Sequence, residues 1–523
     1  MVQTGMERKI VNPAEIHEIR LSGQGLTVEM VVAAARFGAH VTIEEKAVAA
    51  MQESRQLVEE IVEGDTPVYG INTGFGEFSK VRIGHDSIDQ LQKNLIMSHS
   101  TATGQPLKEE VVRAMLLLRA NALCNGFSGI RPQVVQLLVD MLNARVHPVV
   151  PEKGSLGASG DLAPLAHMVL PMLGMGEAVY QGERMSGAAA MEKAGLTPVS
   201  LKAKEGLALI NGTQVLTSIG TLAFYDTLQA ARMADIAVSL SMEALTALLN
   251  AFDPRVHAVR PHQGQSLVAA NVRTITKDSP ILAKSQNLRV QDAYAIRCTG
   301  QVHGAVRDTL DFIRRTIETE LNSVTDNPIL FTEEGDVISG GNFHGEPMAF
   351  AFDFLGIVCS ELANISERRL ERLVNPALSN GLPAFLTNEG GVNSGFMIVQ
   401  YSAASMVSEN KVLAHPASVD SIPSSANQED HVSMGTTAAR KAAQIVENTL
   451  SVIAMELMGA AQGIDLRGGE PSPVSKKVYG RIREKVDFWD RDREMWRDVA
   501  AMNELVRDGS LVEIVSELCP EFQ

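Results

Sequence analysis

Long runs of helical periodicity constrain the fold of this chain more than any other feature of its sequence. From Phe352 to Leu373, apolar residues recur at spacings of three, four and eight, and charged residues lie between them. Residues 437–462 follow the same pattern and end beside Gly463, a residue type that commonly terminates helices. Residues 111–123 and 132–142 are also helical in pattern. Several helices of this length without intervening strands predict a mainly α protein built around a long helical bundle.

Strand signals are sparse, and aromatic side chains are few. Short β patterns occur at residues 67–71 and 337–339. Aromatic residues make up 5% of the 523 residues, against 45% for all hydrophobic types, so the core must be built from Leu, Ile, Val, Ala and the 22 Met. These residues, the β-branched ones apart, favour helices. With 21% charged residues, the chain has the composition of a globular protein with a large core.

The charge and cysteine content argue against several kinds of partner. The chain carries 62 Asp and Glu against 46 Lys and Arg, a formal net charge of −16, which is opposite to what binding a nucleic-acid backbone requires. Its four cysteines lie far apart and form no Cys-x-x-Cys pair, so neither a disulfide framework nor a zinc site is predicted. No apolar signal-peptide region and no stretch of about 18 apolar residues is apparent. We therefore expect a cytoplasmic protein without a metal and without nucleic-acid or membrane partners.

The segment from Gly154 to His167 is the most informative part of the sequence for function. It is a run of small residues followed by a helix start, with Asp161 as the N-cap and Pro164 in the first turn. A glycine loop leading into a helix is the plain interpretation. A phosphate-binding loop is disfavoured because no Gly-Lys-Ser/Thr follows, and a nucleophile elbow because the Gly-x-Ser-x-Gly pattern around Ser159 is incomplete.

The triplet Ala158-Ser159-Gly160 has a further chemical capability. A tightly bent backbone can bring the Gly160 amide nitrogen onto the Ala158 carbonyl carbon, and glycine tolerates the angles that this bend demands. The whole segment resembles the prosthetic-group segment of the histidine and aromatic amino acid ammonia-lyase family. The resemblance implies that the triplet cyclises autocatalytically and that Ser159 dehydrates. The product is the electrophile 4-methylidene-imidazol-5-one (MIO), with no external cofactor and with Asp161 orienting the loop.

The resemblance covers about residues 26–467 and includes several further motifs in family order. These are Tyr69–Gly76, which resembles the family's mobile inner loop, Asn211–Thr213, Gln291–Tyr294 with Arg297, Thr325–Pro328, and Gly341–Gly345. The implied fold is that of the mainly α ammonia-lyase and fumarase-like superfamily. Residues 1–200 would form a smaller N-terminal domain with the inner loop and the MIO segment, and residues 201–523 a long helical bundle with C-terminal helices. Family members are homotetramers whose active sites draw residues from more than one subunit.

The resemblance also assigns roles to individual residues. Tyr69 is expected to be the general base, although a free phenol with a pKa near 10 needs nearby donors or positive charge for that task. Arg297 is expected to bind the substrate carboxylate through its bidentate fork. Outside the family motif, Tyr69 would read as a packed loop aromatic and Arg297 as half of a surface ion pair. The residues implied to bind the MIO carbonyl, the amine and the carboxylate are Asn211, Gln291 and Tyr294, and Phe343 resembles the packing wall beside the MIO.

Two residues favour histidine as the substrate. In the family, the position of His99 contacts the substrate side chain, and the pair Ser98-His99 is typical of histidine ammonia-lyases. Glu429 would complement an imidazole N–H and would be costly opposite a plain phenyl ring. Without the resemblance, His99 would be a structural histidine and Glu429 a solvated loop acid. The implied reaction is elimination of ammonia from L-histidine to give trans-urocanate.

Some departures from the family pattern keep alternatives open. Glu77 occupies a position where tyrosine 2,3-aminomutases often carry Glu, Thr299-Gly300 replaces a segment that usually ends in Pro, and Ala295 stands where Ser is commoner. The alternatives are a tyrosine or phenylalanine ammonia-lyase, an aromatic 2,3-aminomutase with the same MIO chemistry, and a non-catalytic helical-bundle homologue. Intact Tyr69, Ser159 and Arg297 argue against the last.

Overall fold

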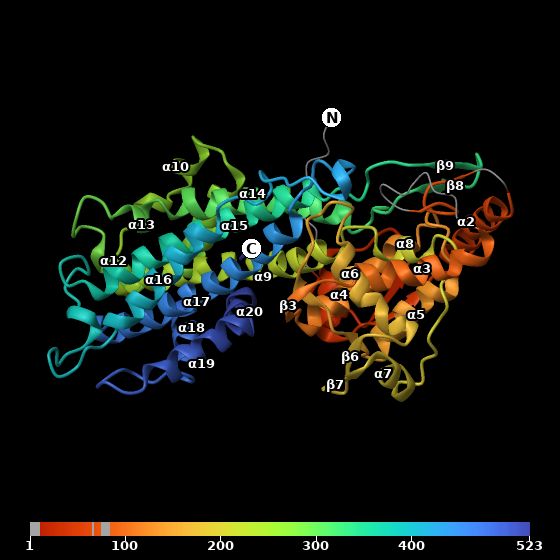
Figure 1. Ribbon diagram of the computed structural model, residues 1–523. Coiled ribbons are helices and arrows are strands. Elements are labelled where there is room, and N and C mark those ends of the chain that lie inside the picture. The colour runs from red at the N-terminus through yellow and green to blue at the C-terminus, as the bar shows by residue number, and fades with distance from the viewer. Residues whose placement is uncertain (1–10, 65–66, 75–83) are drawn as a thin grey trace. The chain divides into compact units, whose positions relative to one another are not determined.

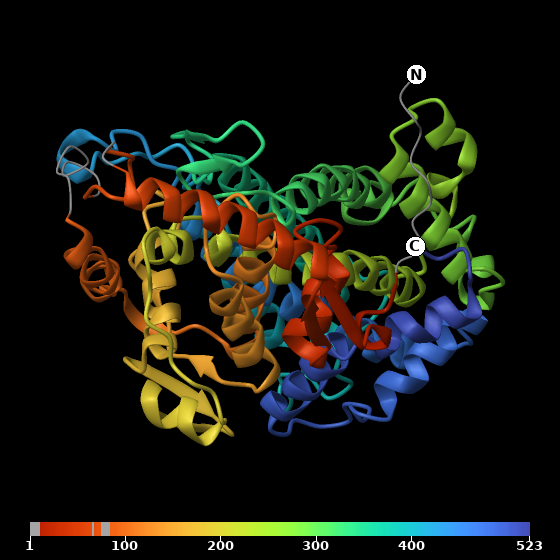
Figure 2. The same cartoon turned by 90° about the vertical axis from the view of Figure 1, so that its right-hand side faces the viewer.

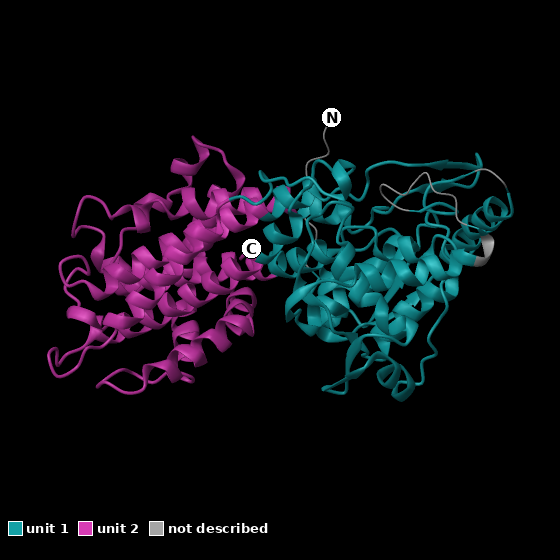
Figure 3. Cartoon of the chain, viewed as in Figure 1, with its two compact units in different colours: residues 1–225, 314–352, 416–440 teal, residues 226–313, 353–415, 441–523 magenta. Residues whose placement is uncertain are grey.

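The protein is mainly α-helical, as the periodicity predicts. The computed structural model describes residues 11–64, 67–74 and 84–523, and long helices dominate it (Figure 1). The chain divides into two compact units (Figure 3). Unit 1 comprises residues 1–225, 314–352 and 416–440, and unit 2 comprises residues 226–313, 353–415 and 441–523.

Four long helices contribute residues to both units. They are α9 (Gln214–Ala244), α14 (Thr299–Glu320), α15 (Glu346–Val374) and α17 (Gly435–Arg467). Each unit therefore draws on three separate stretches of sequence. The expected division into domains of residues 1–200 and 201–523 stays a prediction, because compactness does not show which part of the chain folds independently.

Most residues of α15 and α17, the two helices that the periodicity predicts most clearly, belong to unit 2. One detail of that prediction is wrong: α17 passes through Gly463 and continues to Arg467, where Gly468 follows with φ +68°. A Cβ at Gly463 would lie 2.9 Å from the Cβ of Ala244, so this glycine serves close helix packing and not helix termination. The other helices of unit 2 are α10 (Pro254–Ala258), α11 (Gln263–Ile275), α12 (Pro280–Ser285), α13 (Tyr294–Arg297), α16 (Met397–Leu413), α18 (Pro473–Arg483), α19 (Met495–Arg507) and α20 (Ser510–Leu518).

Unit 1 combines shorter helices with small sheets. β1 and β2 pair in parallel (red in Figure 2), and the other sheets are antiparallel, in the orders β3-β5, β4-β6-β7 and β8-β9. The strands are β1 (Glu18–Leu21), β2 (His40–Ile43), β3 (Thr103–Pro106), β4 (His147–Pro148), β5 (Pro151–Lys153), β6 (Glu177–Tyr180), β7 (Glu183–Ser186), β8 (Ile329–Phe331) and β9 (Asp336–Ile338). The helices are α1 (Val28–Val32), α2 (Glu45–Glu63), α3 (His85–His99), α4 (Glu109–Leu123), α5 (Pro132–Asn143), α6 (Leu162–Val169), α7 (Gly187–Lys193) and α8 (Glu205–Ile210).

One of the two predicted strand segments is a turn. Residues 337–339 overlap β9, but in residues 67–71 the Ile71 and Asn72 amides both donate to the Val68 carbonyl, at 3.2 and 3.3 Å. The Asn72 side chain closes the turn by accepting from the Val68 amide at 2.7 Å, and Gly70 has φ +72°. The side-chain hydrogen bond and the glycine outweigh the β propensity of the apolar residues.

α15 is long and apolar enough to cross a membrane by length and composition alone. In its most apolar window, however, 61% is buried inside the protein. That degree of burial is typical of a core helix in a globular protein.

A buried ion pair joins three helices inside unit 2. Arg369 on α15 and Glu456 on α17 are both fully buried, with Nε to Oε1 at 2.5 Å and Nη2 to Oε2 at 2.8 Å. The hydroxyls of Ser241 on α9 and Ser366 on α15 donate to the same carboxylate, at 2.7 and 2.6 Å. The carboxylate is therefore hydrogen-bonded on both oxygens, which is the condition under which a buried charge is tolerated.

We expect Glu456→Gln to lower the free energy of unfolding by about 3–5 kcal/mol, because the substitution leaves the Arg369 charge buried without its counter-charge. Urea unfolding measures this change. The double variant Arg369→Met/Glu456→Met serves as the control and should retain more stability than Glu456→Gln. A change below about 1 kcal/mol in the single variant would contradict the expected cost.

Candidate active site

Two glycines meet backbone to backbone at the centre of the candidate site. Gly160 has φ +75° and Gly212 has φ +153°, and the Asp161 amide donates to the Gly212 carbonyl at 2.7 Å. A Cβ on Gly160 would lie 2.1 Å from the Gly212 oxygen. Only glycine fits at Gly160, and this contact holds the segment that ends in Ser159-Gly160 against the start of α9.

The Asp161 carboxylate fastens the same segment to α9. It is fully buried and accepts from the amides of Val215 and Leu216, both at 2.9 Å, in the first turn of that helix. The hydroxyls of Ser155, at 2.7 Å, and Thr436 also donate to it. Burial raises the pKa of Asp161 above its ordinary value, and these four donors oppose that rise.

The predicted N-cap position of Asp161 is confirmed, but the side chain serves a different helix. Asp161 stands at the N-cap position of α6, but its side chain makes no capping hydrogen bond there. It caps α9 instead, where the amide donors and the helix dipole favour a negative charge. Local sequence pattern cannot distinguish the two helices, because both begin near small residues.

Ser159 is held at its carbonyl and at its hydroxyl. The Asn211 Nδ2 amide donates to the Ser159 carbonyl oxygen at 2.7 Å. The Ser159 Oγ hydroxyl donates to Glu429 Oε1 at 3.1 Å. The structure thus brings three predicted site residues, Ser159, Asn211 and Glu429, into direct contact.

A short hairpin-like turn positions Glu429. The Ser424 amide donates to the Glu429 carbonyl at 2.9 Å, and the Glu429 amide returns a bond to the Ser424 carbonyl at 3.3 Å. The Ser424 hydroxyl also donates to Glu429 Oε2 at 3.3 Å. Between the two residues, Ser425, Ala426 and Asn427 all have positive φ, between +50° and +67°. Such angles are costly for residues other than glycine, so the loop is shaped by these contacts and not by local preference.

His99 lies at the end of α3, and its Nδ1 is 3.0 Å from the Ser98 hydroxyl. Burial lowers the pKa of His99, while a hydrogen bond from the His99 ring to the Leu95 backbone carbonyl and the charge of Glu429 oppose the shift. The negative charge of Glu429 therefore acts on the His99 imidazole, and the predicted role of His99 in the site stays a prediction.

Arg119 was not predicted from the sequence, yet it holds the Asn211 backbone in place through a hydrogen bond. This fully buried side chain donates through Nη1 to the Asn211 carbonyl at 2.9 Å and to Gln214 Oε1 at 2.7 Å. Burial lowers the pKa of Arg119 to about 10, against the attraction of Asp326. Asp326 in turn binds the buried Lys204 ammonium at 2.9 Å. The sequence did offer a sign of this role, because Arg119 directly follows the apolar residues 114–118 of α4, and a charged residue in such a place is buried only with partners.

Phe343 and Tyr69 also belong to unit 1. Phe343 is half-buried in the loop before α15, and the next residue, His344, stacks on His431 with ring centroids 5.7 Å apart. This stack ties the Phe343 loop to the loop of Glu429. Tyr69 is half-buried in the turn that Asn72 closes. The rest of the inner loop, with Phe75, Gly76 and Glu77, lies outside the described residues.

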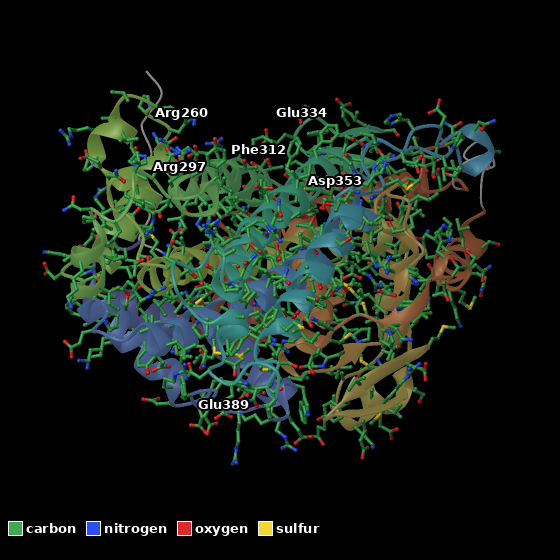
Figure 4. The ribbon with its side chains drawn as sticks, turned by 90° about the vertical axis from the view of Figure 1, so that its left-hand side faces the viewer. Arg260, Arg297, Phe312, Glu334, Asp353 and Glu389 are labelled. Atoms are coloured by element: carbon green, nitrogen blue, oxygen red, sulfur yellow. The ribbon has the colours of Figure 1, made fainter. Side chains whose placement is uncertain are left out.

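The remaining predicted residues belong to unit 2, where Gln291 and Tyr294 are exposed and Arg297 is half-buried. Gln291 is exposed and Tyr294 is 69% exposed on the one-turn helix α13. Arg297, labelled in Figure 4, ends that helix, and its guanidinium carbon lies 4.5 Å from the centre of the Tyr294 ring. Arg297 is thus paired with an aromatic face, an arrangement that keeps a guanidinium available for a carboxylate. Within residues 11–64, 67–74 and 84–523, no group of three His, Cys, Asp or Glu side chains is arranged to hold a metal ion.

Comparisons with known proteins show the family and the fold of the chain. The chain matches the aromatic amino acid lyase family over residues 26–484. A curated relative from Alkaliphilus metalliredigens (strain QYMF), named histidine ammonia-lyase, is 56% identical over 502 residues, which cover 96% of this chain and 99% of the relative. The structure of histidine ammonia-lyase from Trypanosoma cruzi is 44% identical, with a TM-score of 0.90 and coverage of 97% of this chain and 96% of that one. Tyrosine aminomutase from Streptomyces globisporus is 36% identical, with a TM-score of 0.91 and coverage of 96% and 98%.

The fold is that of the ammonia-lyases and aminomutases just compared. The extent of the match settles the family: this chain belongs to the aromatic amino acid lyase family.

We expect Gly212→Ala to destabilise the protein by at least about 2 kcal/mol, because the added Cβ would lie 2.4 Å from Arg119 Nη1 and 2.5 Å from Gln214 Oε1. Thermal and urea unfolding measure the loss. Gly182→Ala is the matched control, since Gly182 also has positive φ (+79°) but nothing lies within 4 Å of its Cβ position. Equal losses in the two variants would show that backbone angle, and not the crowding at Gly212, sets the cost.

Proposed function

We propose that this protein is a histidine ammonia-lyase that eliminates ammonia from L-histidine to give trans-urocanate. The observation that carries the proposal is the contact of Ser159 with both Glu429 and Asn211, together with the charge of Glu429 acting on His99. A carboxylate and an imidazole offer complementary partners for the two ring nitrogens of a histidine substrate. Curated relatives named histidine ammonia-lyase, at 50–56% identity over almost the whole chain, support it.

The residues around Ser159 fit formation of an MIO group from Ala158-Ser159-Gly160. Gly160 has the positive φ and the absent Cβ that a bent, cyclising backbone needs, and Asp161 fixes the loop behind it. Asn211 donates to the carbonyl that would become part of the ring. When present, the group supplies an electrophile that no unmodified side chain offers, and so activates a substrate with a poor leaving group.

The chain's own residues supply the other tasks of the reaction. Tyr69 is the proposed base that removes the β-proton of the substrate. Arg297 is proposed to bind the substrate carboxylate with Tyr294, and Gln291 to hydrogen-bond the substrate, in line with the Arg297–Tyr294 stack and the exposure of Gln291 and Tyr294. Phe343 is the proposed packing wall of the site.

Histidine is preferred over other aromatic amino acids because of the polar groups opposite the ring. A phenyl group offers neither Glu429 nor His99 a hydrogen bond and would displace water from both, which costs about 1–3 kcal/mol for each polar group that loses a partner. The similarity to tyrosine aminomutase in fold does not discriminate, since lyases and aminomutases share one scaffold. The alternatives of a tyrosine or phenylalanine lyase or a 2,3-aminomutase are therefore outcomes of the substrate experiment.

We also propose a cytoplasmic homotetramer. Exposed apolar side chains gather on α15 and α16 within unit 2, among them Phe354, Ile357, Ile398 and Tyr401. Apolar faces of this kind mark association surfaces. The acidic charge and the absence of a cysteine pairing pattern support the location.

The first prediction concerns the prosthetic group. The tryptic peptide from Gly154 to Arg184 should be lighter than its sequence by the mass of two waters, because cyclisation and dehydration each release one. Mass spectrometry of the purified protein measures this difference. Ser159→Ala, which has no hydroxyl to lose, is the control and should lose one water at most. An unmodified wild-type peptide would contradict MIO formation.

The second prediction concerns the substrate. Purified protein is incubated separately with histidine, tyrosine and phenylalanine, and the unsaturated acid is followed by its ultraviolet absorbance. We expect the fastest formation from histidine. His99→Leu should lower kcat/KM for histidine by about 10- to 100-fold, the equivalent of one lost polar contact, and affect phenylalanine far less. The exposed His40→Leu is the control. Turnover of tyrosine alone, or a β-amino acid product on chromatography, would favour the alternatives.

The third prediction concerns assembly. Light scattering should give a mass four times the 56.3 kDa of the chain. Charged residues placed on the apolar face, as in Ile357→Glu/Tyr401→Glu, should dissociate the assembly, and the same change at the exposed Val11 should not. A monomer mass for the unaltered protein would refute the homotetramer.

A further inference from the structure

The contact between Ser159 and Glu429 involves the one hydroxyl that maturation must remove. The Ser159 Oγ donates to Glu429 Oε1 at 3.1 Å, while the Ser159 carbonyl accepts from Asn211 at 2.7 Å. Dehydration of Ser159 breaks its Cα–H bond and its Cβ–Oγ bond. A proton must therefore leave Cα, and a proton must reach Oγ.

We propose that Glu429 is a catalytic residue of this maturation and carries the proton from Cα to Oγ of Ser159. The Glu429 carboxylate takes the Cα proton as the Cα=Cβ double bond forms, and it delivers the proton to Oγ as the Cβ–Oγ bond breaks. The oxygen departs as water with its own hydrogen and the delivered one, and Glu429 returns to its ionised form. The step needs no other reactant. This inference rests on the proposed function, since it assumes that the MIO group forms.

The geometry suits such a shuttle. Oγ is two bonds from Cα, so a carboxylate oxygen in hydrogen-bond contact with Oγ lies within reach of the Cα proton after a small rotation. Removal of that proton moves negative charge onto the Ser159 carbonyl oxygen, and the Asn211 amide already donates to that oxygen. Base and charge-stabilising donor therefore contact the same residue through different atoms.

Glu429 is also held in place for this task. The Ser424 hydroxyl binds its second oxygen at 3.3 Å, and paired backbone bonds between the two residues lock the turn. The nearby Asp161 carboxylate is a poorer candidate. Its oxygens accept from Ser155, Thr436, Val215 and Leu216, and none of these donors is on Ser159.

The proposal implies two successive roles for one carboxylate. Before dehydration, Oε1 is occupied by the Ser159 hydroxyl. After the hydroxyl leaves, that oxygen has lost a donor and is open to the substrate ring. Maturation would thus remove the Ser159–Glu429 hydrogen bond and free the same carboxylate oxygen to bind the substrate ring.

The test follows the Gly154–Arg184 peptide by mass spectrometry at set times after synthesis in a cell-free system. The proteins are the unaltered chain, Glu429→Gln, Glu429→Asp and the adjacent, exposed Asp430→Asn, which removes the same charge one residue away. Folding of each variant is checked by light scattering and urea unfolding. We expect Glu429→Gln to accumulate a peptide lighter by one water and to lose the second about 100-fold more slowly than the unaltered chain. Glu429→Asp, which keeps a carboxylate, should recover part of the rate, and Asp430→Asn should mature normally.

Two outcomes distinguish a failure of this inference from a failure of the proposed function. If Glu429→Gln is folded and loses both waters at the unaltered rate, Glu429 has no part in maturation, and the proposed function stands. If the unaltered chain loses no water at all, the MIO group itself does not form and the proposed function fails. Slow maturation in a folded Asp430→Asn variant would also overturn the inference, because it would show that loop charge and not the Glu429 carboxyl sets the rate.

Discussion

The contact between the backbones of Gly160 and Gly212 is the constraint on which the rest of the site depends. With a carbonyl 2.1 Å from where a Cβ would stand, no side chain can occupy Gly160. The contact brings the end of the small-residue segment against the start of α9, and so sets Ser159 within reach of Asn211. Both positions require glycine because neighbouring atoms leave no room for a Cβ, and not because the folded protein needs flexibility there.

Buried charges hold this contact together on both sides. The Asp161 carboxylate joins the segment to the first turn of α9, and the Arg119 guanidinium holds the Asn211 carbonyl. Charged hydrogen bonds are strong in a low-dielectric interior and directional enough to fix neighbouring backbone. The price of placing them there is desolvation, which is visible in the raised pKa of Asp161 and the lowered pKa of Arg119.

The helices could be predicted from sequence because apolar periodicity reports burial directly, and α15 and α17 follow it closely. The errors have a common cause. Gly463 reads as a helix end, and the Asp161 side chain is expected to serve α6, yet each acts through a partner distant in sequence, Ala244 and α9 respectively. The motif residues of the site were found through family resemblance, whereas Arg119 was missed because it acts on the site through backbone contacts that no local pattern reveals. Apolar periodicity shows which face of a helix is buried, but it does not show which distant segments contact that face.

The two groups that flank Ser159 come from far along the chain. Asn211 lies 52 residues after it and Glu429 lies 270 residues after it. Loop closure over such lengths is slow to occur even though its entropic cost rises only gradually with length. Under the proposed maturation, the chemical state of one serine depends on nearly the whole chain having been synthesised and folded, so that each modified molecule would carry a covalent record of its own completed folding.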